Sequence, residues 1–292
     1  MTKTPVLLDT DIGSDIDDAV ALAYLLRKRE CDLLGITTVS GDVQKRAALA
    51  EAVCHAAGRH DVPIHCGRRD VLIDGPGQPK VPQFEAIAHK NPRLDRPEND
   101  AVKFLQKTIR QHPGEITLLT IGPYSNIALL FALDPEIPSL LKSIISMGGI
   151  FYGGDRKEWN ALVDPAATAM VYSAHRKQHL SVGLDVTEKC VMEADEVRSR
   201  FIDEPLLTVR SMAETWFKHT KALTFHDPLA ATLIFHPELC EYESGQIHVS
   251  YGVGEPTSGH TKFVAGPGPD QVAKTVNVEG FFAEYFKVVH GA

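Results

Sequence analysis

The sequence predicts an α/β fold with one open, mostly parallel, Rossmann-like sheet and helices on both faces. Short apolar segments alternate with segments rich in helix formers along the 292 residues. Parallel strands joined by helical crossovers give this pattern, and short continuous apolar runs are typical of strands that are covered on both faces. No internal repeat or low-complexity linker interrupts the alternation, so we expect residues 1–292 to form a single domain.

The first half of the chain begins with Val6–Leu8, a short apolar strand followed by carboxylates. Asp18–Arg29 is rich in helix formers and ends in basic residues, which suit a helix C-terminus. Leu33–Val39 has the β-branched content of a buried strand. Gln44–Gly58 is predicted to be an Ala-rich helix that ends at its glycine, and Val62–His65 to be another short strand.

The second half continues the alternation. A strand at Ile116–Ile121 precedes a helix at Ser125–Leu133, and Ile144–Met147 is a strand before a Gly-Gly turn. Asp164-Pro165 opens a helix, with Asp at the cap and Pro at the first helical position. The remaining expected elements are a strand at Leu180–Leu184, helices at Leu206–Leu223 and Pro228–Phe235, a strand at Lys274–Val278 and a helix at Gly280–Val289.

One long segment, residues 70–97, departs from this alternation. It is rich in Gly and Pro and has weak periodicity. A loop of this length in a compact α/β domain is usually functional or mobile. We therefore expect it to act as a flap.

The composition excludes several classes of protein. Hydrophobic residues make up 43% and charged residues 23% of the chain, which is ordinary globular composition and argues against disorder or a coiled coil. The 30 Lys and Arg residues against 38 Asp and Glu residues give a net charge of −8. Broad binding to nucleic acid or to an anionic membrane needs a basic surface, so neither is expected.

The cysteines and the N-terminus bear on the compartment. The five cysteines are odd in number and widely spaced, without a C-x-x-C pair, so neither a disulfide framework nor a structural zinc site is expected. The N-terminus lacks the pattern of a signal peptide, and no apolar run approaches the roughly 18 residues of a membrane span. We expect a cytoplasmic protein.

The most informative stretch is an acidic one directly after the first strand. Five carboxylates occur within ten residues there: Asp9, Asp11, Asp15, Asp17 and Asp18. Ligands bind outside the carboxyl ends of strands in open α/β sheets. A helix N-terminus stabilises a carboxylate by only about 0.3–1 kcal/mol, too little to hold several of them buried side by side. A hard divalent cation would neutralise them, and an all-oxygen set suits Ca²⁺ or Mg²⁺.

Other known motifs share parts of this acidic pattern. An EF-hand loop that starts at Asp9 needs Glu at its twelfth position, which is Val20, so that interpretation fails. Haloacid dehalogenase phosphatases use Asp-x-Asp-x-Thr/Val after their first strand, which Asp9 and Asp11 fit up to Gly13. A Mg²⁺-dependent phosphohydrolase is therefore an alternative. A solvated acidic turn with helix caps is the interpretation without a ligand.

The stretch resembles the signature of the inosine-uridine preferring nucleoside hydrolase family, Asp-x-Asp-x-Gly followed by Asp-Asp-Ala. Further segments match in the family's order, and together they cover the whole chain: Thr37–Val43, Ile121–Ala128, Met147-Gly148-Gly149 with Glu158-Trp159-Asn160 and Asp164-Pro165, Phe225-His226-Asp227-Pro228, and Thr257–Thr261. The resemblance implies hydrolysis of the N-glycosidic bond of ribonucleosides, with tightly bound Ca²⁺.

The resemblance also implies roles at the metal. Asp11 would ligate Ca²⁺ and take the proton from the water bound there. Asp18 and Asp227 would be further ligands, together with the backbone carbonyl of Ile121. The family usually has Thr at that position, but a carbonyl ligand tolerates the substitution.

For the substrate, the resemblance places Asp17 on the ribose hydroxyls, where a carboxylate also favours positive charge on the sugar. Glu158 and Asn160 should bind the ribose, and Asp42 should contact the ribose or orient a ligand. His226, with an unperturbed pKa of about 6.5, suits delivery of a proton to the departing base.

Two points depart from the family pattern or stay open. Two extra residues separate Gly13 from the Asp-Asp pair, so Asp15 is additional. We expect it to be a helix N-cap, with roles as a supporting group or an actual ligand as alternatives.

The resemblance implies a homodimer or homotetramer, and it suggests that the flap and the helix before His226 set base preference. A binding protein for nucleosides or ribose that lacks turnover is the non-enzymatic alternative.

Overall fold

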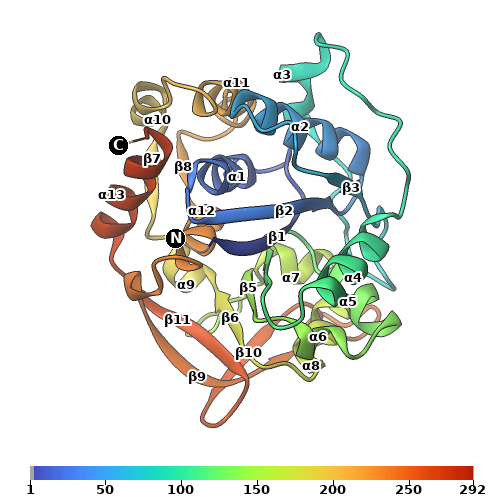
Figure 1. Ribbon diagram of the computed structural model, residues 1–292. Helices are drawn as coiled ribbons and strands as arrows, with labels where there is room; N and C mark the ends of the chain where they lie inside the picture. The colour runs from blue at the N-terminus through green and yellow to red at the C-terminus, as the bar shows by residue number, and fades with distance from the viewer. Residues whose placement is uncertain (1–2, 292) are drawn as a thin grey trace.

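The computed structural model describes residues 3–291 and contains a nine-stranded sheet between two layers of helices (Figure 1). The strand order is β10-β9-β11-β6-β5-β4-β1-β2-β3. Its strands are β1 (Thr4–Thr10), β2 (Cys31–Thr38), β3 (Ile64–Cys66), β4 (Thr117–Thr120), β5 (Ser143–Met147), β6 (His179–Val182), β9 (Cys240–Val249), β10 (Thr261–Ala265) and β11 (Asp270–Val276). The predicted α/β class is confirmed.

The sheet is mostly parallel. All neighbouring strands from β11 to β3 pair in parallel, and only the pairs that β9 makes with β10 and β11 are antiparallel. A separate small ladder pairs β7 (Val191–Glu193) with β8 (Ala222–Thr224). The strands that the sequence predicts belong to the parallel part of the sheet. Parallel strands are buried on both faces and therefore have the continuous apolar runs from which they were predicted.

The helices complete the two outer layers. They are α1 (Asp17–Arg27), α2 (Val43–Ala56), α3 (Glu85–Ala88), α4 (Ala101–Gln111), α5 (Ser125–Leu133), α6 (Ile137–Leu140), α7 (Trp159–Val163), α8 (Pro165–Ser173), α9 (Leu184–Thr187), α10 (Ala194–Arg200), α11 (Leu206–Trp216), α12 (His226–Leu233) and α13 (Val278–Val289), with short 3₁₀ turns at Pro82–Phe84 and Pro237–Leu239.

A hydrophobic core lies on each face of the sheet, and β1 contributes to both. Val6 and Leu8 point into the core beneath α1 and α12, whereas Leu7 points into the core beneath α4 and α5. Side chains alternate between the faces of a strand, so three consecutive apolar residues serve both cores. This explains why β1 is fully buried over its last five residues. A rigid, buried strand thus leads directly into the acidic stretch.

The structure corrects one prediction in the second half of the chain and adds a hairpin that was not predicted. The helix expected at Leu206–Leu223 ends at Trp216, and Ala222–Thr224 forms β8 instead. Leu223 is buried opposite Met192 of β7, a cross-strand pairing that no local pattern reveals. The long hairpin of β9 and β10 was not predicted, because its exposed strands carry many polar residues.

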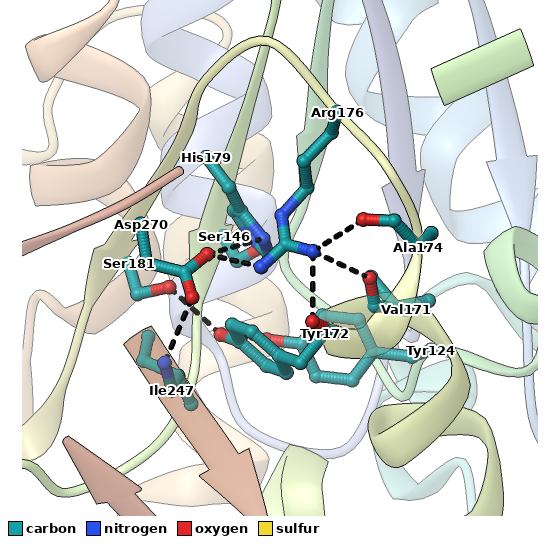
Figure 2. A network of polar contacts seen from close by, with 10 residues as sticks. All are labelled: Tyr124, Ser146, Val171, Tyr172, Ala174, Arg176, His179, Ser181, Ile247 and Asp270. Carbon is teal, nitrogen blue, oxygen red and sulfur yellow. Dashed lines mark hydrogen bonds and ion pairs between the residues drawn. The ribbon is translucent and has the colours of Figure 1, made fainter. Parts of the chain in front are cut away.

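A buried polar network joins this hairpin end of the sheet to α8 (Figure 2). Arg176 donates to the backbone carbonyls of Tyr172 at 2.8 Å and Ala174 at 2.7 Å, and it forms an ion pair with Asp270. The other carboxylate oxygen of Asp270 accepts the backbone N–H of Ile247 at 2.8 Å. The network therefore links the C-terminus of α8 with β11 and β9 (Figure 2).

The segment 70–97 has little regular structure of its own, only the turn at Pro82–Phe84 and α3. Its first part is attached to its surroundings. The backbone N–H of Leu72 donates to Asp164 at 2.9 Å, and Asp74 accepts the backbone N–H of Gly254 at 3.1 Å.

Two observations relate to the expected compartment. Within residues 3–291, no helix combines the length and the apolarity needed to cross a bilayer. All five cysteines are free and buried.

Candidate active site

The site lies where the chain changes direction across the sheet. From β1 the chain continues to β2 and β3 on one side, whereas β4, on the other side of β1, leads on to β5 and β6. Open α/β sheets bind ligands at the carboxyl ends of the strands beside such a switch point. Asp11 follows β1 and Ile121 follows β4, and both line a cavity of about 230 Å³. The segments that follow β1 and β4 approach each other closely. A Cβ added to Gly122 would lie only 2.8 Å from the backbone nitrogen of Asp11.

The fold gathers most of the predicted site residues around this cavity. Eight of the nine line it: Asp11, Asp17, Asp18, Ile121, Glu158, Asn160, His226 and Asp227. They come from segments that are far apart in the sequence. The ninth residue, Asp42, lies elsewhere.

Three carboxylates form a buried cluster in the cavity. Carboxylate oxygens of Asp17, Asp18 and Asp227 lie within 4.8 Å of one another. Asp17 and Asp18 are the first two residues of α1, and Asp227 is the second residue of α12. The backbone N–H of Asp227 donates to Asp17 at 3.0 Å. The packing of α1 against α12 therefore brings the N-terminal motif to the late His-Asp pair.

Electrostatics indicates that this cluster needs a positive partner. Burial raises the pKa of Asp17 to about 7. Burial, and then the neighbouring carboxylates, raise the pKa values of Asp18 and Asp227 well above their ordinary range. An all-oxygen group of like charges suits a hard divalent cation. The donor set thus fits a metal ion, and Asp11 and Ile121, which carry further oxygen atoms, line the same cavity.

A buried arginine, Arg46 of α2, holds the loop that follows β1. Its guanidinium donates to the backbone carbonyl of Asp11, to that of Ile12 at 3.1 Å and to the Ser14 hydroxyl at 3.0 Å. It is fully buried, and its charge faces Asp11 and Asp18. Sequence reasoning missed Arg46, because nothing in an Ala-rich helix indicates which residue will turn back toward another loop.

A glycine makes the same loop possible. Gly13 has φ +116°, a backbone conformation that L side chains rarely adopt, and a Cβ there would lie 2.5 Å from Val81. The glycine of the motif therefore permits the close approach of residue 81, within segment 70–97, to the acidic loop.

Supporting contacts surround Asp9, which does not line the cavity. Asp9 accepts hydrogen bonds from Asn126 at 2.7 Å and from Thr37. Burial raises its pKa to about 7. Asn126 also accepts the backbone N–H of Arg68 at 2.8 Å. These contacts join β1, β2, α5 and the loop after β3 beneath the site.

One prediction about an acidic residue is wrong, and one stays a prediction. Asp15 was expected to be the N-cap of α1, but the cap residue is Ile16, without a side-chain hydrogen bond, and Asp15 accepts the backbone N–H of Ile16 at 2.6 Å. Asp15 instead lines the cavity. Asp42 was expected to contact the ribose or orient a ligand. It caps α2 by accepting the backbone N–H of Lys45 at 3.2 Å and does not line the cavity, so that role stays a prediction. Both residues are Asp, a preferred residue type at a helix N-cap. Only the structure shows that Asp42 is used as a cap and Asp15 is not.

Glu158 and Asn160 are held by backbone contacts. The Glu158 carboxylate accepts N–H groups from Gly149 at 3.1 Å, Asn160 at 2.8 Å and Ala161 at 2.9 Å. The Asn160 amide donates to the carbonyls of Ile121 at 3.0 Å and Met147 at 3.2 Å. Asn160 therefore joins the ends of β4 and β5, and its amide oxygen is not used in these two bonds.

His226 is the first residue of α12, and a hydroxyl group contacts its ring at one nitrogen. Its Nδ1 lies 2.7 Å from the Thr187 hydroxyl at the end of α9. Burial lowers the pKa of His226, while the carboxylates of Asp15 and Glu188 oppose that effect. Since Nδ1 is paired with Thr187, Nε2 is the nitrogen available to a bound molecule. Thr187 is a second contact that sequence reasoning missed.

The proteins that this chain resembles in sequence are nucleoside hydrolases and nucleosidases. The model of the family described as inosine-uridine preferring nucleoside hydrolase matches residues 6–283. Uridine nucleosidase 1 of Arabidopsis thaliana is 29% identical over 325 residues, which cover 97% of this chain and 91% of the plant protein. The non-specific ribonucleoside hydrolase RihC of Escherichia coli (strain SMS-3-5 / SECEC) is 29% identical, with 96% of each chain covered.

Solved structures agree on the fold. The Inosine-Guanosine Nucleoside Hydrolase (IG-NH) superposes with a TM-score of 0.85 at 19% identity, covering 99% of both chains. The Purine-Preferring Ribonucleoside Hydrolase from Gardnerella vaginalis superposes with a TM-score of 0.84 at 24% identity, covering 99% of this chain and 98% of its own. Because the family model spans the sheet and the whole acidic cavity, the chain belongs to the inosine-uridine preferring nucleoside hydrolase family.

Proposed function

We propose that this protein hydrolyses the N-glycosidic bond of ribonucleosides to ribose and free base, with Ca²⁺ as its metal. The observation that carries the proposal is the single cavity in which buried carboxylates, an amide and a histidine meet. Family membership supports the reaction. Glycosidic hydrolysis needs a proton acceptor for water, stabilisation of an oxocarbenium-like sugar and a proton donor for the leaving group.

Asp18, Asp227, Asp11 and the Ile121 carbonyl would hold the metal ion. A mixed set of carboxylates and a backbone carbonyl favours Ca²⁺, whereas Mg²⁺ prefers a strict octahedron that keeps several waters. When bound, such a cation lowers the pKa of a water molecule and neutralises the clustered carboxylates.

The chain's own groups would perform the other tasks. Asp11 takes a proton from the attacking water. Asp17 binds ribose hydroxyls and favours positive charge on the sugar, and Asn160 adds its amide oxygen to the sugar contacts. Glu158 lines the same wall, but three backbone N–H groups already occupy its carboxylate. Its first task is therefore to keep the loop and α7 in place.

His226 would deliver the proton to the departing base. The Thr187 hydroxyl at Nδ1 fixes the ring. Burial lowers the pKa of His226, and the carboxylates of Asp15 and Glu188 offset part of that effect in favour of the protonated form that a general acid requires. Asp15, the extra carboxylate of the sequence, thus acts near the leaving group rather than as a helix cap.

The reaction is tested with purified protein and a panel of purine and pyrimidine nucleosides. Release of reducing sugar from inosine or uridine supports the proposal. Release of phosphate from sugar phosphates would instead support the phosphohydrolase alternative. Binding of ribose without sugar release from any nucleoside would indicate a binding protein.

Removal of the metal should abolish turnover and lower thermal stability. After EGTA treatment and dialysis, we expect sugar release to fall to background and the Tm to fall by several degrees, because the buried carboxylates then repel each other. A ligand present at 100 times its Kd contributes about 2.7 kcal/mol. Ca²⁺ should restore both values better than Mg²⁺ at equal concentration. Full activity in protein shown to be metal-free would contradict the proposal.

Replacement of His226 by Gln should lower kcat on inosine by about 10²-fold, because the base then leaves without a proton. Turnover of p-nitrophenyl riboside should change little, since p-nitrophenolate leaves as a stable anion. His219→Gln, at an exposed position of the preceding segment, is the matched control. Equal losses on both substrates would exclude a role as general acid.

We infer that residues 1–292 act as one domain whose segment 70–97 serves as a flap, since Gln78 of that segment lines the cavity. Family resemblance implies a homodimer or homotetramer, which light scattering measures directly.

A further inference from the structure

A row of buried polar side chains crosses the sheet on the face that carries Leu7. Every member of this polar row is 0% exposed. Burying a hydroxyl or a carboxylate costs free energy unless the group is hydrogen-bonded, so strands that are otherwise apolar would gain by replacing it. The members lie opposite one another on five neighbouring strands: Thr37 of β2, Asp9 of β1, Thr120 of β4, Ser146 of β5 and Ser181 of β6.

The two serines of the polar row have partners (Figure 2). The Ser146 hydroxyl lies 2.6 Å from Nε2 of His179. The Ser181 hydroxyl lies 2.8 Å from the hydroxyl of Tyr172. The part of the row on β5 and β6 is therefore satisfied.

The part of the row on β1 and β4 is only half satisfied. The Oδ1 atom of Asp9 accepts hydrogen bonds from Asn126 at 2.7 Å and from Thr37. Within residues 3–291, the Oδ2 atom of Asp9 and the Oγ1 atom of Thr120 have no hydrogen-bond partner. A buried polar atom without a partner is costly, so each of these two atoms favours a partner close by.

Asp9 and Thr120 are the nearest candidates for each other. They are register partners on adjacent strands, which lie about 4.8 Å apart. The backbone already joins the same place, because the N–H of Ile121 donates to the carbonyl of Asp9 at 2.9 Å. A hydrogen bond from the Thr120 hydroxyl to the Asp9 carboxylate would satisfy both side chains at once.

This pair lies at the base of two segments that supply oxygen atoms to the proposed metal site. Thr120 directly precedes Ile121, and Asp9 lies two residues before Asp11. Both Ile121 and Asp11 line the cavity, whereas Asp9 and Thr120 do not. The pair can therefore affect the metal through the backbone that it holds, without touching the metal itself.

We propose that Thr120 is a positioning residue of the metal centre, an inference that rests on the proposed function. Its hydroxyl donates to Oδ2 of Asp9 and so fixes the ends of β1 and β4 relative to each other. This sets the position of the Ile121 carbonyl relative to the Asp11 carboxylate. Groups that orient metal ligands from outside the ligand set typically change metal affinity by about 10- to 100-fold when they are removed.

The test is Ca²⁺ affinity, measured by calorimetry on protein that has been treated with EGTA and dialysed. Thr120→Val removes the hydroxyl and keeps the shape of the side chain, so Ca²⁺ affinity should fall by about 10-fold or more. Thr120→Ser keeps the hydroxyl and loses a methyl group, so its Ca²⁺ affinity should stay within about threefold of wild type. A role in packing alone predicts the reverse order, because only the serine leaves a cavity.

The matched control is Thr117→Val at the other end of β4. Thr117 is 3% exposed, and its hydroxyl lies 3.2 Å from that of Ser143. It does not line the cavity or precede a residue that does, so Ca²⁺ affinity should change by less than about twofold. Circular dichroism checks that each variant is folded. If Thr120→Val does not fold, Thr120→Ser and Thr120→Ala, which differ only in the hydroxyl, should differ in Ca²⁺ affinity by the same factor as Thr120→Val and wild type.

Substrate binding separates the metal effect from a general loss of the site. The probe is 9-deazainosine, whose base is joined to ribose through carbon and cannot be hydrolysed. At saturating Ca²⁺, Thr120→Val should bind it within about threefold of wild type, because the residues assigned to the sugar are unchanged.

Two results would overturn the inference alone: wild-type Ca²⁺ affinity in folded Thr120→Val, or equal losses in Thr120→Val and Thr117→Val, with wild-type protein that binds Ca²⁺ and releases sugar from nucleosides. If wild-type protein does not bind Ca²⁺, the metal of the proposed function fails, and this inference fails with it.

Discussion

Asp11→Asn should lower the turnover of a ribonucleoside by about 10³-fold, with nucleoside affinity changed by only a few fold. Asn keeps the size and one oxygen of the side chain, but it cannot accept the proton of the attacking water. A positioned general base contributes about 10²–10⁴-fold to rate. Asp17 and Asn160, which we assign to the sugar, are unchanged, so kcat rather than KM should carry the loss.

The matched control is Asp42→Asn. It makes the same chemical change on a carboxylate that caps α2 and does not line the cavity. Asn is as good an N-cap as Asp, so both activity and stability should stay close to wild type. Steady-state kinetics on inosine, combined with calorimetry on 9-deazainosine, measures both quantities. Turnover of Asp11→Asn near the wild-type value would exclude Asp11 as the base.

Arg46→Met should destabilise the protein by about 3–5 kcal/mol, the usual cost of removing one partner from a buried charge group. The substitution leaves the carbonyls of Asp11 and Ile12 without their donor. It also removes a positive charge that faces Asp11 and Asp18. The loop after β1 should lose its fixed shape, so metal affinity should fall together with stability.

Urea unfolding measures the effect, with Lys45→Met as the control on the neighbouring residue. Lys45 pairs with Asp42 at 3.0 Å near the surface, where its side chain is 40% exposed, and an exposed pair contributes at most about 1 kcal/mol. If Arg46→Met does not fold, Arg46→Lys is measured as well. It keeps the charge but loses most of the five N–H donors of the guanidinium. Its free energy of unfolding should therefore lie between those of Arg46→Met and Lys45→Met. An Arg46→Met protein as stable as Lys45→Met would show that Arg46 does not support the site.

The parts of this fold that the sequence predicted are those with strong local signals. Val6–Leu8, Leu33–Val39 and the Asp164-Pro165 helix start were recognisable because buried strands and helix caps have characteristic local compositions. The hairpin of β9 and β10 and the strand β8 were not, since pairing with a distant strand determines them. Similarly, the helix expected to end at Leu223 ends at Trp216, because Leu223 is buried against β7.

The sequence by itself determined the family, the fold class and the eight predicted residues that now line one cavity. Asp11, Asp17 and Asp18 follow a buried strand directly, and this local order is visible in any sequence. Only the tertiary structure decided that Asp227 joins them, that Asp15 lines the same cavity as His226 and that Asp42 does not line it. The physical reason is that charge clustering, unlike strand or helix formation, depends on distances between segments that packing alone brings together. Arg46 belongs to the same group, because its five hydrogen bonds reach residues that are 6 to 35 positions away.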